Sequence, residues 1–423
     1  HMDKLSSETD LGVQLSLCLR LENLIYHTGG GVVRHFRRLS LMLHFTREEF
    51  AARQRDAIDA MRTRNLDGLL MFRQESMYYL TGYDTMGYSQ FQCLYLGADG
   101  HLTLLTRSAD LRQALQTSTI EDIRVWADRA DSNPGLDLRS ILEEKGLSGG
   151  LLGVELDAYS LTGQRWDMVR SALEGFCFHE DASGLVNRLR LVKSESELVY
   201  VRRAAELADD ALEEANRLAT PGASEQDVLA AMHNAIFRGG GDYPASRFII
   251  GAGERALMVR NFTGYGTIGD NDQLQLEFGG AYRHYHSCLM RTVLTGNPDS
   301  QQVRMHAACV DALRACQEAS RPGVTFGEVF DTHAQVLDDA GFGEHRLNAC
   351  GYSLGALYPP TWMDWPMLYA DNPIVVQPNM VIFMHMILLD SERGLAMSVG
   401  ETSLITETGC ERLSRMELDL VVN

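Results

Sequence analysis

The sequence lacks the features of a membrane protein or a nucleic-acid-binding protein. It contains no run of about 18 or more uncharged apolar residues, the length that a membrane-spanning helix requires. Basic residues are scarce, since 38 Lys and Arg stand against 57 Asp and Glu and give a net charge of −19. Nucleic-acid phosphates are bound by clustered Lys and Arg, so we expect neither a membrane nor a nucleic acid as partner.

Cysteine pairing motifs are also absent. The eight cysteines are scattered and form no Cys-x-x-Cys pair or short disulfide framework, which favours free thiols in a reducing compartment. A basic start, an apolar run and a small-residue cleavage site do not occur in the order of a signal peptide. We therefore predict a cytoplasmic protein.

The length and composition are those of a globular protein with two domains. Apolar residues make up 45% of the chain and charged residues 22%. Residues 1–43 show no clear periodicity, and we expect a poorly ordered extension there. From a capping box at 46–49 (Thr-Arg-Glu-Glu), helices and strands alternate in an α/β domain over 44–187. Residues 188–423 form the second domain.

The second domain is predicted to contain paired helices and several strands. Pro-Gly dipeptides at 221–222 and 322–323 interrupt two helical stretches in the same way, which indicates two similar halves. The predicted helices cover 194–218, 224–238, 298–318 and 325–340, and the predicted strands cover 246–250, 256–260, 350–358, 380–389 and 395–406.

The stretch 273–292 carries an unusual density of reactive side chains. Apolar and polar residues alternate over 273–278, as in a half-buried strand, and an aromatic-rich strand follows over 282–290. We expect Gly279 and Gly280 to form the turn of this hairpin. Glu277, His284 and His286 are costly to bury on a hairpin unless they are paired or used.

This hairpin resembles that of the creatinase/aminopeptidase P superfamily, whose catalytic domain has the pita-bread fold. In metal-dependent members, Asp-x-Gly on one arm and Asp-x-x-Arg-Thr on the other supply aspartates to two metal ions. Here Glu277 and Cys288 occupy the two aspartate positions, while Arg291 and Thr292 are kept. The resemblance implies an α/β amino-terminal domain and an α+β pita-bread carboxy-terminal domain.

The remaining metal-ligand positions also differ from the family pattern. The resemblance assigns Tyr352 to the position of a histidine, His385 to that of a glutamate, and Glu401 to that of the final glutamate. Two hard divalent cations prefer more carboxylates than these residues offer, so we predict no metal and no cofactor. A single zinc ion held by Cys288, His286 and His385 remains an alternative.

The departures are similar to those of the metal-free branch, represented by ectoine hydrolase and creatinase. The shared motifs lie at 277–286, at 350–355 (Cys-Gly-Tyr-x-x-Gly) and at 358–362 (Tyr-Pro-Pro-x-Trp). The resemblance implies a metal-independent hydrolase that cleaves a C–N bond of a small zwitterionic amide, amidine or guanidino compound. It also implies a homodimer in which the amino-terminal domain of one subunit closes the active site of the other.

Without a metal, the catalytic groups must be side chains. A buried glutamate can act as a general base or nucleophile, and histidine can transfer protons near neutral pH. We expect Arg260 to bind a substrate carboxylate, at a position where the family often has a histidine. The predicted catalytic residues are Glu277, His286, His385 and Glu401, and the predicted substrate-binding residues are Arg260, Tyr282, Tyr352, Trp362, Arg73 and Tyr83.

Several alternatives stay open at this point. His286 is equally explained as a hydrogen-bonded core histidine, and Arg260 as an exposed strand residue. The same explanation is weaker for His385, which stands at a ligand position inside an apolar run. Glu277 and Glu401 can form a buried carboxylate pair neutralised by arginines such as Arg291. The other two functions considered are a metal-dependent Xaa-Pro dipeptidase or aminopeptidase and a non-catalytic binding protein on the same fold.

Overall fold

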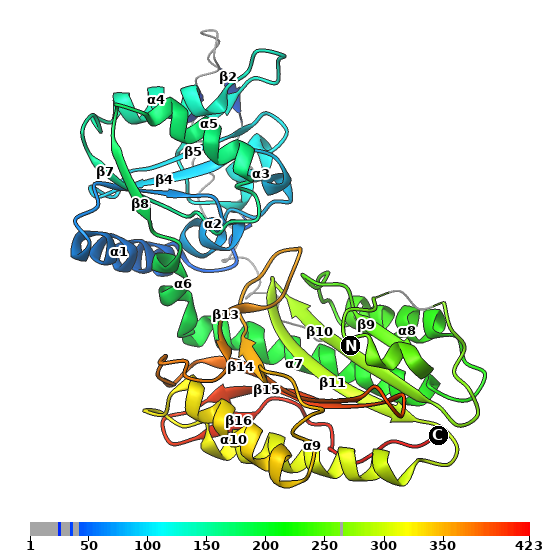
Figure 1. Ribbon diagram of the computed structural model, residues 1–423. Helices are drawn as coiled ribbons and strands as arrows, with labels where there is room; N and C mark the ends of the chain where they lie inside the picture. Colours follow the sequence, from blue (N-terminus) through cyan, green and yellow to red (C-terminus); the bar gives the residue numbers. More distant parts are fainter. Residues whose placement is uncertain (1–23, 27–33, 37–41, 263–264) are drawn as a thin grey trace, which may run out of the picture. The chain divides into compact units, whose positions relative to one another are not determined.

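The computed structural model describes residues 24–26, 34–36, 42–262 and 265–423, and the chain forms two compact units (Figure 1). The amino-terminal unit comprises His1–Phe50, Met61–Arg73 and Thr81–Asp181. The carboxy-terminal unit comprises Ala51–Ala60, Gln74–Leu80 and Ala182–Asn423. The prediction of a poorly ordered extension over 1–43 falls largely outside the described residues. Within it, β1 (Leu24–Tyr26) and β2 (Arg34–Phe36) pair antiparallel.

The amino-terminal unit is built on a six-stranded mixed sheet in the order β6-β5-β4-β3-β7-β8. Helix α1 (Arg47–Thr63) begins as predicted, because the Thr46 side chain accepts a hydrogen bond from the Glu49 amide at 3.2 Å. The strands are β3 (Gly68–Met71), β4 (Cys93–Gly97), β5 (Leu102–Arg107), β6 (Asp122–Trp126), β7 (Leu151–Val154) and β8 (Phe178–Asp181). The other helices before the long carboxy-terminal ones are α2 (Gln74–Thr81), α3 (Leu111–Thr117), α4 (Pro134–Glu144), α5 (Gly163–Leu173) and α6 (Gly184–Leu191).

The carboxy-terminal unit is an eight-stranded antiparallel sheet flanked by long helices, in agreement with the predicted pita-bread architecture. The strand order is β13-β12-β14-β15-β11-β10-β9, with β16 paired to β15. The strands are β9 (Ile249–Ala252), β10 (Gln273–Tyr282), β11 (Tyr285–Leu294), β12 (Gly351–Ser353), β13 (Asp364–Leu368), β14 (Val381–Asp390), β15 (Leu395–Ile405) and β16 (Cys410–Arg412). The helices are α7 (Glu195–Leu218), α8 (Glu225–Arg238), α9 (Ser300–Ala319) and α10 (Phe326–Asp339).

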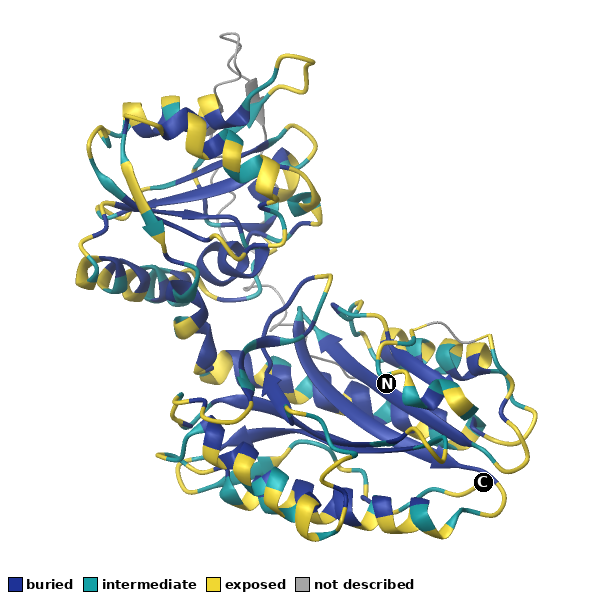
Figure 2. Ribbon diagram, viewed as in Figure 1, coloured by how far each residue is buried: buried dark blue, intermediate teal, exposed yellow. Residues whose placement is uncertain are grey.

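The two faces of this sheet differ chemically. On one face, here called the helix face, Gly280 touches α7 and Met384 belongs to the apolar core packed with α9 and α10. Side chains alternate along a strand, so Glu277 of β10 points to the opposite face, here called the pocket face. Cys288 of β11 shares that face, because it pairs with Gly279. Figure 2 shows that the central strands are buried.

The turn of the hairpin lies four residues later than predicted. Arg283 and His284, with φ of 49° and 67°, connect β10 and β11, and the predicted turn at Gly279 and Gly280 is wrong. These glycines stand inside β10 for a packing reason. A Cβ at Gly280 would meet the Ala204 carbonyl oxygen and lie 2.6 Å from the Ala208 nitrogen, both on α7.

One predicted strand is also absent. Residues 256–260 do not form a strand, because Gly253–Leu257 is the 3-10 helix η2 and a loop follows it. The strand predicted at 246–250 begins at Ile249 instead. The loop at 243–248 and the loop that carries Arg260 are thereby free to form the walls of a pocket.

Candidate active site

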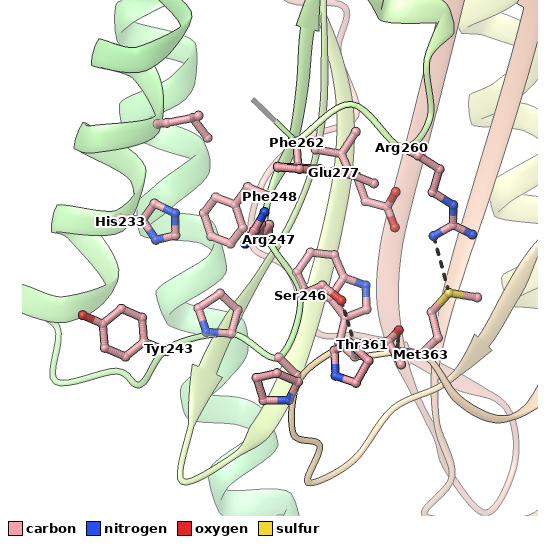
Figure 3. Close-up of a pocket in the computed structure, with 17 residues that line it drawn as sticks. His233, Tyr243, Ser246, Arg247, Phe248, Arg260, Phe262, Glu277, Thr361 and Met363 are labelled. Atoms are coloured by element: carbon pink, nitrogen blue, oxygen red, sulfur yellow. Dashed lines mark hydrogen bonds between the residues drawn. The ribbon is translucent and has the colours of Figure 1, made fainter. Parts of the chain in front are cut away.

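A pocket of about 760 Å³ opens on the pocket face of the carboxy-terminal unit, with Glu277 in its wall (Figure 3). Three segments form most of the lining: α8 at Leu229 and His233, the loop leading into β9 at residues 243–249, and the loop before β13 at residues 359–363. Arg260 and Phe262 complete it. The pocket is thus built by loops and a helix around the middle of a central strand.

Glu277 is the acidic residue of this wall, and its side chain is held rigidly. Strand β10 pairs with β11 on one side and β9 on the other, and the residue is only 9% exposed. Burial raises the pKa of the Glu277 carboxyl to about 7, although hydrogen bonding from Tyr352 and the positive charge of Arg260 act in the opposite direction. A carboxyl with this pKa exchanges protons readily near neutral pH.

Tyr352 and Trp362 orient the Glu277 carboxylate. The Tyr352 hydroxyl donates to Oε1 of Glu277 at 3.1 Å and accepts from the Trp362 indole N–H at 2.9 Å. Burial, reinforced by the Glu277 charge, raises the pKa of Tyr352 well above 10, so the phenol stays protonated and keeps donating. The three side chains form a fixed hydrogen-bonded row that ends on the carboxylate.

His385 lies beside Tyr352 but does not line the pocket. The two ring centroids are 5.6 Å apart, and the imidazole is buried. Burial lowers the pKa of His385 to about 3, so its ring is neutral at physiological pH. Within the described part of the chain, its Nδ1 has no hydrogen-bond partner, which is uncommon for a buried polar atom.

His286 is a core histidine, and its predicted catalytic role is corrected here. Its Nε2 accepts from the Ala245 amide at 2.8 Å, and its Nδ1–H donates to the His284 carbonyl at 2.7 Å. Burial lowers the pKa of His286 to about 4, so the ring is neutral at physiological pH. With both nitrogens hydrogen-bonded to backbone groups, His286 holds the loop at 243–246 in place.

Glu401 also lies away from the pocket, so its predicted role in holding substrate is corrected. It is fully buried on the helix face, where Arg291 donates to Oε1 and Arg412 to Oε2, each at 2.7 Å. The residue on the pocket face is its neighbour Gly400, which pairs with His385. Adjacent residues of a strand point to opposite faces of the sheet. The position of the family's final glutamate therefore corresponds to Gly400, and the sequence analysis assigned it to Glu401, one residue too late.

Three further predicted residues do not line this pocket. Tyr282 is on the helix face, and its ring lies 5.7 Å from that of Tyr200 on α7. In the amino-terminal unit, the Tyr83 side chain is completely buried and its hydroxyl donates to Gln92 at 3.1 Å, so it cannot touch a substrate. Arg73 in the same unit forms an ion pair with Asp157 at 2.8 Å.

Arg260 and Trp362 do lie in the wall, and the structure adds residues that the sequence did not reveal. The additions are mainly aromatic and apolar, with one further guanidinium at Arg247 (Figure 3). The signal that could have identified them is the loop 243–248 (Tyr-Pro-Ala-Ser-Arg-Phe), where aromatic rings and an arginine gather outside any regular element. The added residues include His233, Tyr243, Arg247, Phe248, Phe262 and Met363.

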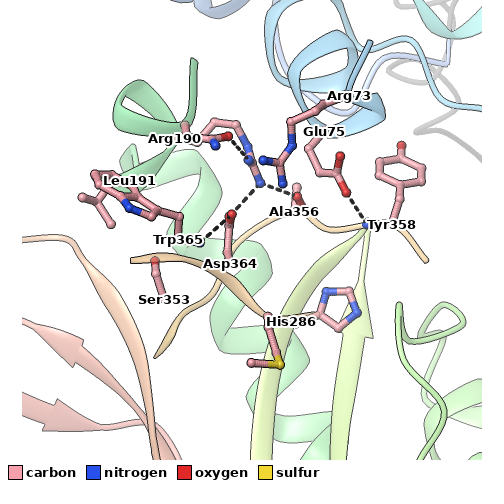
Figure 4. A network of polar contacts seen from close by, with 12 residues as sticks. Arg73, Glu75, Arg190, Leu191, His286, Ser353, Ala356, Tyr358, Asp364 and Trp365 are labelled. Atoms are coloured by element: carbon pink, nitrogen blue, oxygen red, sulfur yellow. Dashed lines mark hydrogen bonds and ion pairs between the residues drawn. The ribbon is translucent and has the colours of Figure 1, made fainter. Parts of the chain in front are cut away.

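A buried polar network holds the loop that carries Trp362 (Figure 4). Arg190 donates to Asp364 and to the Ala356 carbonyl, both at 2.8 Å. Glu75 accepts from the Tyr358 amide at 3.2 Å. The Trp362 amide itself donates to the Ser246 hydroxyl at 3.0 Å, which joins the two loops of the pocket wall. The indole that positions Tyr352 is therefore fixed from both ends of its loop.

The side chains around Glu277 do not fit the paired metal ions of metal-dependent family members. Within the described residues, no three His, Cys, Asp or Glu side chains are grouped to hold a metal. The Tyr352 phenol donates to Glu277, the Cys288 thiol stands at the second aspartate position, and burial raises the pKa of both well above the usual value. His286, needed for the single-zinc alternative, has no free nitrogen.

The described helices give no sign of a membrane span. None of those helices is both long enough and apolar enough to cross a lipid bilayer.

Comparison with known proteins identifies both units. The Creatinase/Prolidase N-terminal domain matches residues 53–192, and Metallopeptidase family M24 matches residues 199–407. Ectoine hydrolase from Halomonas elongata is 28% identical over 91% of this chain and all of its own length. A Xaa-Pro dipeptidase from Pyrococcus furiosus is 26% identical over 56% of this chain and 67% of its own.

Solved structures show the same fold. A dipeptidase from Pyrococcus horikoshii has a TM-score of 0.77 at 24% identity, covering 88% of this chain and 100% of its own. The dipeptidase PepE from Mycobacterium ulcerans has a TM-score of 0.79 at 22% identity, covering 89% of this chain and 99% of its own. With a creatinase-type amino-terminal domain joined to an M24 pita-bread domain, the chain belongs to the creatinase/aminopeptidase P superfamily of hydrolases.

Proposed function

We propose that the protein is a metal-independent hydrolase that cleaves the C–N bond of an amide-type compound. The observation that carries the proposal is Glu277: a buried carboxyl in a pocket wall, with a pKa of about 7 and an orientation fixed by Tyr352. A general base works best when its pKa lies near the working pH. Glu277 meets that condition without help from a metal ion.

The chemistry assigned to Glu277 is that of a general base and acid. Its carboxylate takes a proton from water as the water oxygen bonds to the amide carbon, and it returns the proton to the nitrogen as the C–N bond breaks. The products are a carboxylic acid and an amine. In a second possible mechanism, the Glu277 carboxylate attacks the amide carbon directly, the amine leaves, and water hydrolyses the resulting anhydride. Isotope labelling distinguishes this mechanism from general-base catalysis.

The relatives support a C–N hydrolase but name different substrates. Similarity to ectoine hydrolase spans nearly the whole chain, whereas similarity to the Xaa-Pro dipeptidase spans little more than half. The side chains around Glu277 fit a two-metal peptidase poorly, since Tyr352 and Cys288 are protonated donors there. These observations favour the metal-independent reaction over the peptidase.

Two properties of the proposed enzyme concern the whole chain. We propose a cytoplasmic homodimer, in keeping with the scattered free thiols and with the family resemblance. Light scattering of the purified protein tests the dimer, and a monomeric mass at assay concentration contradicts it.

The proposed function is tested by substitution of Glu277 in protein freed of metal with a chelator. Glu277→Gln keeps the side-chain shape and removes the base, so turnover of an amide substrate should fall at least about a hundredfold. The exposed Glu254→Gln in η2 is the matched control and should keep full activity. Unchanged turnover in Glu277→Gln contradicts the mechanism. A wild-type protein that binds amides but hydrolyses none would instead be a binding protein.

A further inference from the structure

The charge of the pocket is opposite to that of the chain. The chain carries a net charge of −19, yet the ionised side chains lining the pocket are the guanidinium groups of Arg247 and Arg260. Glu277 is about half protonated at pH 7 and offsets only part of that charge. Burial lowers the pKa of His233, which leaves it neutral there. A local excess of positive charge attracts an anionic group of the ligand.

Arg260 is placed to receive that group. Its charge lowers the pKa of Glu277, so the guanidinium lies within electrostatic range of the carboxyl, and Figure 3 shows the two side chains next to each other. Within the described residues, it forms no ion pair, and its recorded contact is a weak one to the Met363 sulfur at 3.9 Å. An unpaired arginine at the wall of a pocket is a bidentate site for a carboxylate.

The wall on the other side of Glu277 is aromatic. Phe248 stacks on the His233 ring with centroids 4.3 Å apart, and Phe262 lies under the Arg247 guanidinium at 4.6 Å. In Figure 3, Phe248 and Tyr243 lie on the side of Glu277 away from Arg260. Aromatic rings arranged in this way bind flat or apolar groups.

The pocket is also large for a small zwitterion. A compound of about ten non-hydrogen atoms occupies at most about 300 Å³ if each atom takes the volume of a water molecule. The pocket holds about 760 Å³, a volume suited to a ligand more than twice that size.

We propose that the substrate is an N-acyl amino acid with a bulky apolar or aromatic acyl group, rather than a small zwitterion. This inference rests on the proposed function, since it places the amide bond at Glu277. The carboxylate of the amino acid pairs with Arg260, and the acyl group lies against Phe248, Phe262 and Tyr243. Hydrolysis adds one water across the amide and releases a carboxylic acid and an amino acid.

Calorimetric binding to Glu277→Gln tests the inference without requiring turnover. The probes are N-benzoylglycine, its carboxamide N-benzoylglycinamide, N-acetylglycine and ectoine. N-benzoylglycine should bind at least about tenfold more tightly than each of the other three. Arg260→Gln, introduced in the same background, should weaken binding of N-benzoylglycine about tenfold to a hundredfold and leave the carboxamide unchanged. The exposed Arg314→Gln on α9 is the control.

The outcomes separate this inference from the proposed function. Equal binding of acid and carboxamide, or tighter binding of ectoine, overturns the inference; hydrolysis of ectoine by the wild-type protein would then still support the proposed function. The predicted order of binding without hydrolysis of any probe by the wild type supports an N-acyl amino acid as the ligand class but overturns both its role as substrate and the proposed function. Calorimetry repeated on the wild-type protein shows whether the Glu277→Gln background alters the order.

Discussion

At the scale of single residues, the ionisation of Glu277 sets the pH dependence of the proposed reaction. The general base must be deprotonated, and the pKa of its carboxyl is raised to about 7. We therefore expect kcat/KM to rise with pH and to level off above an apparent pKa near 7. A pH–rate profile from pH 5 to 9 measures this. A profile that is flat from pH 5.5 upward, as for an ordinary glutamate, is the contrary result.

Arg260 should shift that profile, because its positive charge lowers the pKa of Glu277. In Arg260→Gln the charge is lost and the carboxyl becomes harder to ionise, so the rising limb should move to higher pH. Arg314→Gln, an exposed arginine of α9, should leave the limb in place. A loss of rate in Arg260→Gln without movement of the limb would assign Arg260 to substrate binding alone.

The same ionisation affects stability, with a sign that follows from proton binding. The pKa of Glu277 is about 7 in the folded protein and near its ordinary value of 4.5 when unfolded, so the folded state holds the extra proton between these values. Its contribution to stability is therefore fully present below pH 4.5 and is lost as pH rises to 7. Glu277→Gln should be more stable than wild type at pH 8, by up to about 3 kcal/mol, and the gap should shrink at pH 5. Urea unfolding at both pH values measures the difference, and a destabilised variant at pH 8 contradicts this account.

The sequence identified Glu277, Tyr352 and Trp362, which the structure joins by hydrogen bonds, because distinctive motifs surround them. It misplaced Glu401, because motif comparison does not resolve which of two adjacent residues faces the pocket. It also could not show that His286 accepts a hydrogen bond from the Ala245 amide, 41 residues away in the sequence. Such contacts depend on tertiary packing and leave no local pattern.

At the scale of elements, Gly280 allows α7 to lie directly on β10. An added methyl group would meet the Ala204 carbonyl and lie 2.6 Å from the Ala208 amide nitrogen, both of which are backbone atoms that cannot move aside alone. We expect Gly280→Ala to lower the free energy of unfolding by about 1–3 kcal/mol. Gly409→Ala, with open space around its Cβ, is the matched control. Equal stability of the two variants in urea unfolding would show that the helix and strand are not in close contact.

The long helices of the carboxy-terminal unit were predictable and the hairpin turn was not. Capping residues at Ser194, Asp299 and Thr325 start helices within one or two residues of the predicted positions, because the capping signal is local. The turn at Arg283 and His284 carries no glycine, whereas the adjacent Gly279 and Gly280 mimic a turn signal. The true reason for these glycines is contact with α7 and with the Cys288 side chain, which only the assembled fold reveals.

At the scale of the whole molecule, two family domains were foreseen from the sequence, and both are present. The overall negative charge, however, does not extend to the pocket, whose wall carries two arginines. Net charge averages over the surface and does not report the charge of one pocket. The catalytic character of the chain likewise depends on a few side chains, since the same fold supports peptidases that use metal ions.

The most direct test of the central claim is the metal content of the protein while it turns over substrate. Elemental analysis should find clearly less than one transition-metal ion per chain, and the rate should be unchanged after treatment with a chelator. A stoichiometric metal, with activity lost on chelation and restored by adding Mn²⁺ or Zn²⁺, would contradict the metal-independent mechanism and return the protein to the metal-dependent peptidases of its family.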